Sequence, residues 1–295
     1  MVDESRARLK LQTPVDFEAC SGLLSYGKPM LMLGSCFADN IGRRLEERGF
    51  PVLVNPMGTL YNPVSIANTL ERIEEGRQFE EGDCTTIGAG DGRVCTFFHH
   101  TSRARENVGT FLADANRELE TAREHWKKSE TLVVTLGTAW CFHNIERQYV
   151  VSNCLKHHPK EFDRRLLAIG ESVSQIERVM KIAGNRQVVF TVSPFRHMAD
   201  GAHGNAVSKS TLLLSAEDIV RRYQNAKYFP SYEIMNDELR DYRFYAEDMT
   251  HPSQQAEQYI FDRFIDYALA EGERERLTEE TKKMKQRSHI NKALR

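Results

Sequence analysis

The sequence has no apolar run near the roughly 20 residues that a membrane-spanning helix requires. Its first ten residues are polar and charged, unlike a secretory signal. It also has no surplus of basic residues, because 40 lysines and arginines stand against 42 aspartates and glutamates, for a formal net charge of −2. These absences argue against a membrane protein and against nucleic-acid binding. We therefore expect a cytoplasmic protein whose 295 residues suffice for one large core or two modest ones.

Signatures of disulfide, metal and dinucleotide sites are also missing. No two of the six cysteines form a Cys-x-x-Cys pair, so reduced thiols are expected, although Cys84 and Cys95 flank a predicted hairpin and could face each other. The adjacent pairs His99-His100 and His157-His158 have no carboxylate or thiolate at ligand spacing. Gly88 to Gly92 lacks the Gly-x-Gly-x-x-Gly spacing and is typical of a turn. We expect neither a metal nor a cofactor.

Strand-like and helix-like segments alternate along the chain. The pattern predicts strands at Pro29 to Leu33, Pro51 to Val54, Thr131 to Leu136, Gln187 to Val192 and Ala226 to Phe229. It predicts helices at Ala38 to Arg48, Pro63 to Glu75, Asn107 to Lys128, Arg164 to Ile182 and Ser208 to Tyr223. Cys84 to His99 has the alternation of a β-hairpin. This order favours an α/β fold with a mostly parallel sheet.

The domain organisation follows from the same pattern. We expect one catalytic domain over residues 1–270, with the β-hairpin as an insertion. Residues 271–295 are highly charged and nearly free of apolar side chains, which indicates a solvated C-terminal helix or tail.

Several reactive or permissive residues follow the predicted strands directly. Ser35, Gly58, Gly137-Thr138 and Ser193-Pro194 all fall at carboxyl ends of strands. In open α/β sheets, ligands bind at that edge. We therefore expect these positions to converge on one site.

Ser35, Asp248 and His251 supply the parts of a nucleophilic site. A serine hydroxyl needs a nearby base, and His251 could serve if Asp248, three residues earlier, holds its Nδ1–H. Ser35 precedes a predicted helix, where backbone N–H groups can face a developing oxyanion. Simpler roles are helix capping for Ser35 and Asp248 and a structural role for His251. Cys36 is an alternative nucleophile, or a small residue packed beneath the turn.

Five segments together resemble a known bacterial family. Gly34 to Ala38 reads GSCFA, the pentapeptide after which the GSCFA family is named. The further similar segments are Asn55 to Pro63 (NPMGTLYNP), Leu136 to Trp140 (LGTAW), Ser193 to His197 (SPFRH) and Asp248 to Pro252 (DMTHP). The family is similar to the SGNH or GDSL-like hydrolases.

This resemblance implies a flavodoxin-like three-layer α/β/α fold and ester hydrolysis or acyl transfer. It implies Ser35 as the nucleophile, His251 as the base and Asp248 as its orienter. It also implies that the N–H groups of Ser35 and Gly58 hold the oxyanion. The substrate it suggests is a small-molecule ester, such as an acylated carbohydrate, with no nucleic-acid or membrane partner.

One departure from the superfamily pattern concerns the oxyanion hole. The usual Gly-x-Asn-Asp segment is replaced by Gly137-Thr138-Ala139-Trp140, so the donor asparagine is absent. Thr138 is one replacement, Asn62 and Asn144 are others, and a hole with only two donors is the remaining alternative.

Further residues are candidates for substrate binding. Three of them follow or adjoin a strand end at the expected edge: Arg196, His197 and Lys209. They either shape the pocket for the acyl or alcohol group, or they belong to a capped junction between a loop and a helix. Asn62 and Trp140 are added as binding candidates, although Trp140 could equally be core. The leading hypothesis is a serine esterase. The alternatives are an O-acyltransferase with the same triad and a carbohydrate-binding module on a degenerate hydrolase scaffold.

Overall fold

A five-stranded parallel sheet forms the centre of the molecule, in the strand order β10-β9-β5-β1-β2. The computed structural model describes residues 12–293. The strands are β1 (Met30–Gly34), β2 (Val52–Val54), β5 (Thr131–Leu136), β9 (Gln187–Val192) and β10 (Ala226–Tyr228). All four pairings between them are parallel. The predicted α/β class with a parallel sheet is confirmed.

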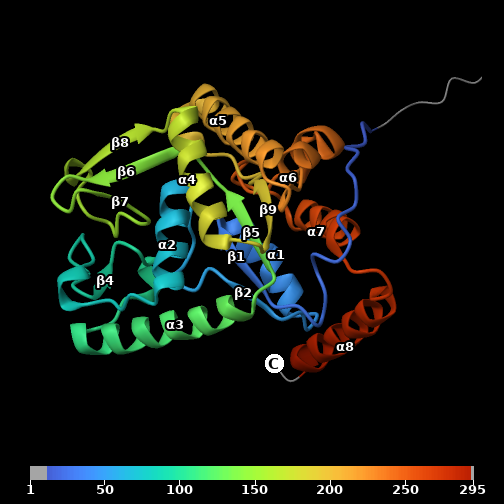
Figure 1. Cartoon of the computed structure of the whole chain (residues 1–295), viewed down its shortest axis with the longest axis horizontal. Helices are drawn as coiled ribbons and strands as arrows, with labels where there is room; N and C mark the ends of the chain where they lie inside the picture. Colours follow the sequence, from blue (N-terminus) through green and yellow to red (C-terminus); the bar gives the residue numbers. More distant parts are fainter. Residues whose placement is uncertain (1–11, 294–295) are drawn as a thin grey trace, which may run out of the picture.

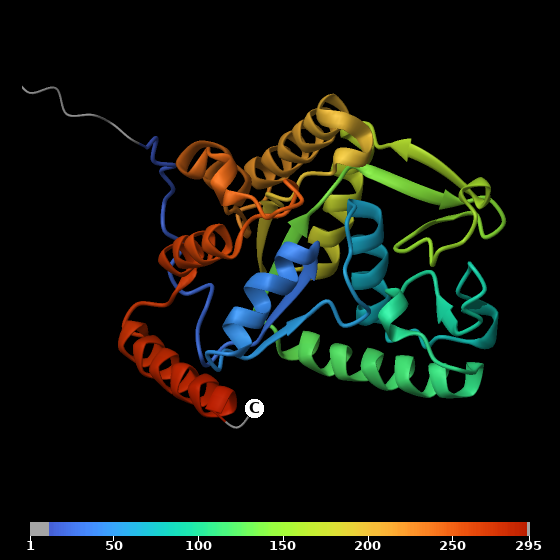
Figure 2. The same cartoon turned by 180° about the vertical axis from the view of Figure 1, so that it is seen from behind.

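Helices cover both faces of this sheet and give a three-layer α/β/α arrangement (Figure 1, Figure 2). Side chains alternate between the faces along each strand, so Leu31 and Leu33 pack in one core cluster and Met30 and Met32 in the other. The first cluster is covered by α2 (Pro63–Glu75), α3 (Val108–Lys128), α4 (Ile169–Ala183) and α5 (Gly201–Arg222). The second is covered by α1 (Cys36–Glu46) and α7 (Gln254–Ala268).

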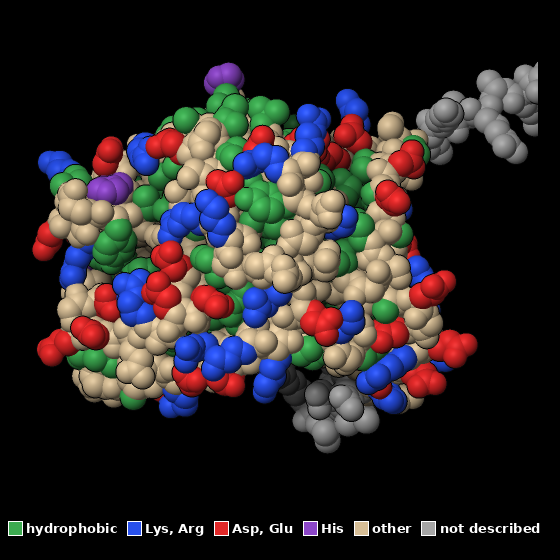
Figure 3. Space-filling view, in the orientation of Figure 1, with side chains coloured by type: hydrophobic (Ala, Val, Ile, Leu, Met, Phe, Trp, Pro, Cys, Tyr) green, Lys and Arg blue, Asp and Glu red, His purple; other side chains and the backbone are tan. Residues whose placement is uncertain are grey.

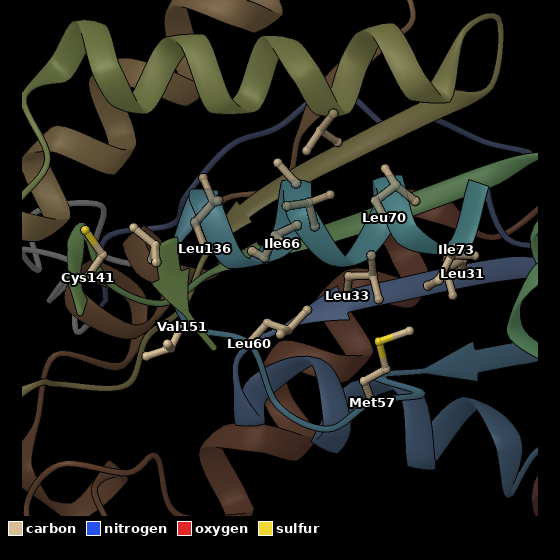
Figure 4. Packing of buried hydrophobic residues seen from close by; sticks show 14 of the residues in the cluster. Leu31, Leu33, Met57, Leu60, Ile66, Leu70, Ile73, Leu136, Cys141 and Val151 are labelled. Atoms are coloured by element: carbon tan, nitrogen blue, oxygen red, sulfur yellow. The ribbon is translucent and has the colours of Figure 1, made fainter. Parts of the chain in front are cut away.

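The packing of α2 shows how the layers are held together. Ile66, Leu70 and Ile73 recur at helical spacing on α2 and lie over Leu31 and Leu33 of β1 (Figure 4). All five side chains are fully buried, and burial of each is worth about 1.5–3 kcal/mol. The packing of α2 on β1 therefore fixes the position of the β1 carboxyl end.

The predicted hairpin is present as β3 (Cys84–Thr86) and β4 (Val94–Thr96). Cys84 is opposite Thr96, and Cys95 is opposite Thr85. Because successive side chains in a strand point to opposite faces, the two cysteines leave opposite faces of the hairpin. Both thiols are free.

A second, three-stranded antiparallel sheet was not expected from the sequence. It contains β6 (Trp140–Asn144), β7 (Tyr149–Val151) and β8 (Phe162–Leu166), in the order β7-β6-β8, and it lies on the same side of the molecule as the hairpin (Figure 1). The prediction of a helix from Arg164 is therefore wrong for its first residues, since α4 begins at Ile169. The exposed, charged residues 163–165 of β8 carry no strand-like alternation.

The carboxyl-terminal part is helical. After β10, α6 (Ser231–Glu233) continues into a π-helical turn (Ile234–Leu239), and α7 is followed by α8 (Arg274–Ala293). The predicted charged C-terminal segment is thus a helix. Lysines, arginines, aspartates and glutamates are interspersed over the face of the molecule seen in Figure 3. Within residues 12–293, no helix combines the length and the apolar character needed to cross a bilayer.

Candidate active site

The carboxyl ends of β1, β5 and β9 meet at one edge of the main sheet. The N–H of Ser35 donates to Thr135 O at 3.2 Å, and the N–H of Ser193 donates to Leu136 O at 2.9 Å. Gly137 lies directly beside the serine, because a Cβ built on Gly137 would be 3.3 Å from the Ser35 Cβ. The convergence of Ser35, Gly137 and Ser193 expected from the sequence is present.

Ser35 lies in a sharp strand-to-helix turn that only glycine can precede. Gly34 has φ +143°, and a Cβ there would be 2.2 Å from Thr135 O. The amide side chain of Asn55 clamps Gly34: its Oδ1 accepts from the Gly34 N–H at 2.8 Å, and its Nδ2 donates to Gly34 O at 3.0 Å. No local sequence pattern indicates this clamp, because Asn55 and Gly34 are 21 residues apart.

The Ser35 side chain caps α1 and is fully buried. Its Oγ accepts a hydrogen bond from the N–H of Phe37 at 3.4 Å. The capping role considered for Ser35 is therefore present. With no exposed surface, the hydroxyl becomes reachable to a ligand only when neighbouring side chains move.

Asp248 and His251 form a hydrogen-bonded pair on a half-exposed loop. The Asp248 carboxylate accepts from the N–H groups of Thr250 and His251, each at 2.9 Å, and from His251 Nδ1. These bonds, the backbone N–H of His251 first, hold the pKa of Asp248 well below its ordinary value. The carboxylate is therefore ionised at neutral pH and fixes the proton of His251 on Nδ1. Among the described residues, His251 Nε2 has no hydrogen-bond partner.

Arg196 holds this loop against the end of β9. Its N–H donates to Thr250 O at 3.0 Å, and its Nη1 donates to Met249 O at 3.2 Å. The His251 ring lies 4.2 Å from the ring of Phe195, centroid to centroid. His251 is thus attached to the strand edge that also carries Ser35. Over residues 12–293, however, no hydrogen bond joins Ser35 to His251.

The N–H groups expected to form an oxyanion hole already have acceptors. Each donates to a backbone carbonyl: Ser35 to Thr135 at 3.2 Å, Gly58 to Asn55 at 2.8 Å and Thr138 to Tyr61 at 2.8 Å. The Thr138 hydroxyl is bonded to Ser208 Oγ at 2.9 Å. In this arrangement none of the three N–H groups is free to bind a ligand.

The asparagines considered as replacement donors have structural partners. Asn62 caps α2, where its Oδ1 accepts from the Ser65 N–H at 2.9 Å. Asn144 accepts from the Arg147 N–H at 2.8 Å, at the far end of β6 from Trp140.

Trp140 begins β6 close to the site. The Arg164 guanidinium lies over the Trp140 ring at 4.3 Å, and the Trp140 Nε1 is buried without a hydrogen-bond partner among residues 12–293. This ring is covered on one face and carries one unused donor.

Lys209 is the most deeply buried charged residue of the site. Its Nζ donates to Gly137 O at 2.6 Å and to Ser193 O at 2.8 Å, so it ties the ends of β5 and β9 together. Burial lowers the pKa of Lys209 to about 7. No carboxylate within residues 12–293 forms an ion pair with it.

His197 is enclosed by aromatic rings. It makes edge-on contacts with Tyr61 at 5.8 Å and with Phe195 at 4.7 Å, centroid to centroid. Burial first, and then the charge of Lys209, lowers the pKa of His197 to about 4, so the ring is neutral at pH 7. The His197 Nε2 is buried and has no hydrogen-bond partner in the part of the chain that the structure describes.

Cys36 does not have the character of a thiolate nucleophile. Burial and the nearby Asp39 carboxylate raise the pKa of the Cys36 thiol to about 11. The small-residue role considered for Cys36 suits this environment better.

A polar cavity adjoins the Asp248–His251 loop. Its volume is about 320 Å³, and its lining includes Arg196, Asn205, Tyr232, Asn236 and Tyr245. Within the described chain, no group of three or more histidine, cysteine, aspartate or glutamate side chains is placed to hold a metal ion. His157, for example, is bonded through Nδ1 to Glu161 and through Nε2 to Thr86 O.

Comparison with protein-family models gives a match that covers most of the chain. The sequence model of the GSCFA family matches residues 29–264, which include Ser35, the Asn55 clamp and the Asp248–His251 pair. No curated protein matches the chain significantly. The chain belongs to the GSCFA family.

Proposed function

We propose that this protein is a serine esterase of the SGNH-like kind that hydrolyses a small ester, such as an acetylated sugar. The observation that carries the proposal is the Asp248–His251 pair. Its carboxylate fixes the imidazole proton on Nδ1 and leaves Nε2 as a proton acceptor, at the sheet edge where Ser35 lies.

The proposed reaction uses the three residues in sequence. His251 Nε2 takes the Ser35 proton while Oγ bonds to the acyl carbon, and Asp248 stabilises the imidazolium that forms. The alcohol leaves with that proton, and an acyl-serine remains. Water, deprotonated by His251, then releases the acid.

Ligand entry is part of this proposal. Ser35 is buried, and its own N–H and that of Gly58 are occupied by backbone carbonyls. The substrate must therefore displace side chains around Ser35 and bring His251 Nε2 within about 3 Å of Oγ. We propose that Tyr61 and His197, whose rings meet edge-on, are among the side chains that move, because the Tyr61 carbonyl accepts from the Gly137 N–H beside Ser35.

Replacement of Ser35 by alanine tests the proposal. We expect ester turnover, measured with a panel of acetyl esters of sugars and of nitrophenol, to fall by about 10³–10⁶-fold. Because Ser35→Ala also removes a helix cap worth about 1 kcal/mol, Asn107→Ala is the matched control. Asn107 caps α3 outside the site by accepting from the Thr110 N–H at 2.9 Å. Unchanged turnover in Ser35→Ala would contradict the proposal.

The occupied N–H groups favour one alternative, a carbohydrate-binding module without catalysis. A degenerate hydrolase would keep Ser35 and His251 but have no free N–H group to stabilise an oxyanion, as in this structure. In that case wild-type protein and Ser35→Ala would bind acetylated sugars with equal affinity in calorimetry, and neither would release acetate.

A further inference from the structure

The chain lacks the third oxyanion donor of the resembled superfamily. Ala139 occupies the position where asparagine would be expected, and its methyl group is fully buried. Of the alternatives drawn from the sequence, the Thr138 hydroxyl is bonded to Ser208, Asn62 caps α2 through its amide oxygen, and Asn144 lies at the far end of β6. Loss of one such donor typically costs about 10²–10³-fold in rate. An esterase with this chain's residues therefore needs another donor.

His197 lies in the neighbourhood of Ser35. Its ring contacts Tyr61, whose carbonyl accepts from Gly137 at 2.9 Å, and Gly137 lies beside Ser35. On the other side the ring contacts Phe195, which in turn contacts His251. His197 is thus placed between the surroundings of the nucleophile and those of the base.

The backbone and ring of His197 are held in place, yet one of its nitrogens is unused. Its N–H donates to Asn205 Oδ1 at 2.9 Å, and two aromatic rings flank the imidazole. The Nε2 atom is buried with no partner in the described chain. Buried polar atoms are nearly always hydrogen-bonded, so this nitrogen has a hydrogen-bonding capacity that a ligand would satisfy.

The protonation state suits a donor that does not act as an acid. Burial and the charge of Lys209 keep the His197 ring neutral at pH 7. A neutral imidazole holds its single N–H proton firmly and can donate it to a developing oxyanion without transferring it. His251, with a carboxylate on Nδ1, has the opposite environment. The two histidines therefore suit different tasks.

We propose that His197 donates a hydrogen bond from Nε2 to the oxyanion and replaces the missing asparagine. This inference rests on the proposed esterase function. As Ser35 Oγ bonds to the acyl carbon, the π electron pair moves onto the carbonyl oxygen, and the Ser35 proton goes to His251 Nε2. His197 contacts the oxygen and keeps its proton. When the bond to the alcohol breaks, the carbonyl re-forms and the alcohol takes the proton from His251.

Two substitutions at His197 test the role. His197→Phe keeps the ring contacts and removes the donor, so we expect kcat to fall by about 10²–10³-fold with KM changed only a few-fold. His197→Gln places an amide N–H near the Nε2 position and should recover part of kcat. The rate of Ser35 labelling by a fluorophosphonate should follow the same order, because its phosphoryl oxygen occupies the oxyanion position.

His99 provides a matched control. It is also buried, its Nε2 has no partner, its pKa is lowered to about 3 by burial, and its ring contacts Phe79 and Phe111. It lies outside the strand edge, so His99→Phe should reduce stability but leave kcat within a few-fold of wild type.

The outcomes separate this inference from the proposed function. Three results would overturn the role of His197: a wild-type kcat in His197→Phe, the same loss of kcat in His197→Gln as in His197→Phe, or the same loss in His99→Phe. If turnover still depended on Ser35 in these cases, the proposed esterase function would stand. A wild-type protein that hydrolyses no ester and is not labelled at Ser35 would overturn the proposed function, and the role of His197 with it.

Discussion

The buried amine of Lys209 makes stability depend on pH in a direction that can be predicted. Its pKa is lowered from 10.5 to about 7 in the folded protein. Between these values the unfolded chain binds a proton that the folded chain does not, so the free energy of unfolding rises with pH through this window. The full difference of about 3.5 pH units corresponds to on the order of 5 kcal/mol.

Replacement of Lys209 by methionine removes this dependence. From pH 7 to pH 8.5, wild-type protein should gain about 1.5 kcal/mol from the Lys209 equilibrium, and Lys209→Met should gain nothing from it. The variant also leaves the carbonyls of Gly137 and Ser193 without their donor, which costs about 1–3 kcal/mol each, but this cost is the same at both pH values. The pH difference therefore isolates the titration.

Urea unfolding at pH 7.0 and 8.5 measures the effect. Cysteines of the unfolded chain, whose ordinary pKa is about 8.5, also begin to titrate in this range, but they contribute equally in wild type and in Lys209→Met. Lys181→Met is the matched control, because the Lys181 side chain is 68% exposed on α4 and its loss should leave the pH dependence of wild type. Equal pH dependence in wild type and Lys209→Met would refute the titration of a buried amine.

Two further substitutions test the positioning of the site. Asp248→Asn should lower kcat/KM for an ester by about 10⁴-fold at unchanged stability, because His251 loses the acceptor that fixes its tautomer. The control Asp91→Asn, in the exposed hairpin turn, should have no effect. Equal activity of the two variants would argue against a role of the Asp248–His251 pair. Gly34→Ala should lower the free energy of unfolding, measured in urea, by at least about 2 kcal/mol, because the new Cβ would be 2.2 Å from Thr135 O. A variant as stable as wild type would show that the turn before Ser35 is not constrained. Gly170→Ala, where no atom lies within 4 Å, is the helical control and should stabilise by up to about 1 kcal/mol.

The parts of the fold that local pattern determines could be predicted. β1 is an apolar run and β5 is rich in apolar and β-branched residues, and α2 has an asparagine cap followed by proline and then apolar residues at helical spacing. Local chemistry also indicated the turn at Ser35 and the pairing of Asp248 with His251, since both depend on residues one to three positions apart.

The missed features depend on contacts between distant segments. Asn55 clamps Gly34 across 21 residues, and Lys209 bonds carbonyls of two strands, a kind of partner that leaves no sequence pattern. β8 carries charged, exposed residues and is a strand because it pairs with β6. The engagement of the Gly58 N–H by Asn55 O likewise follows from the folded loop, not from the residue types.

The central claim is that Ser35 is a nucleophile served by His251. Its most direct test is to treat the wild-type protein with a fluorophosphonate and to map the modified residue by peptide mass spectrometry. The account predicts modification of Ser35, at a rate that falls by orders of magnitude in His251→Ala. A folded protein in which Ser35 stays unmodified, or is modified equally fast without His251, would contradict it.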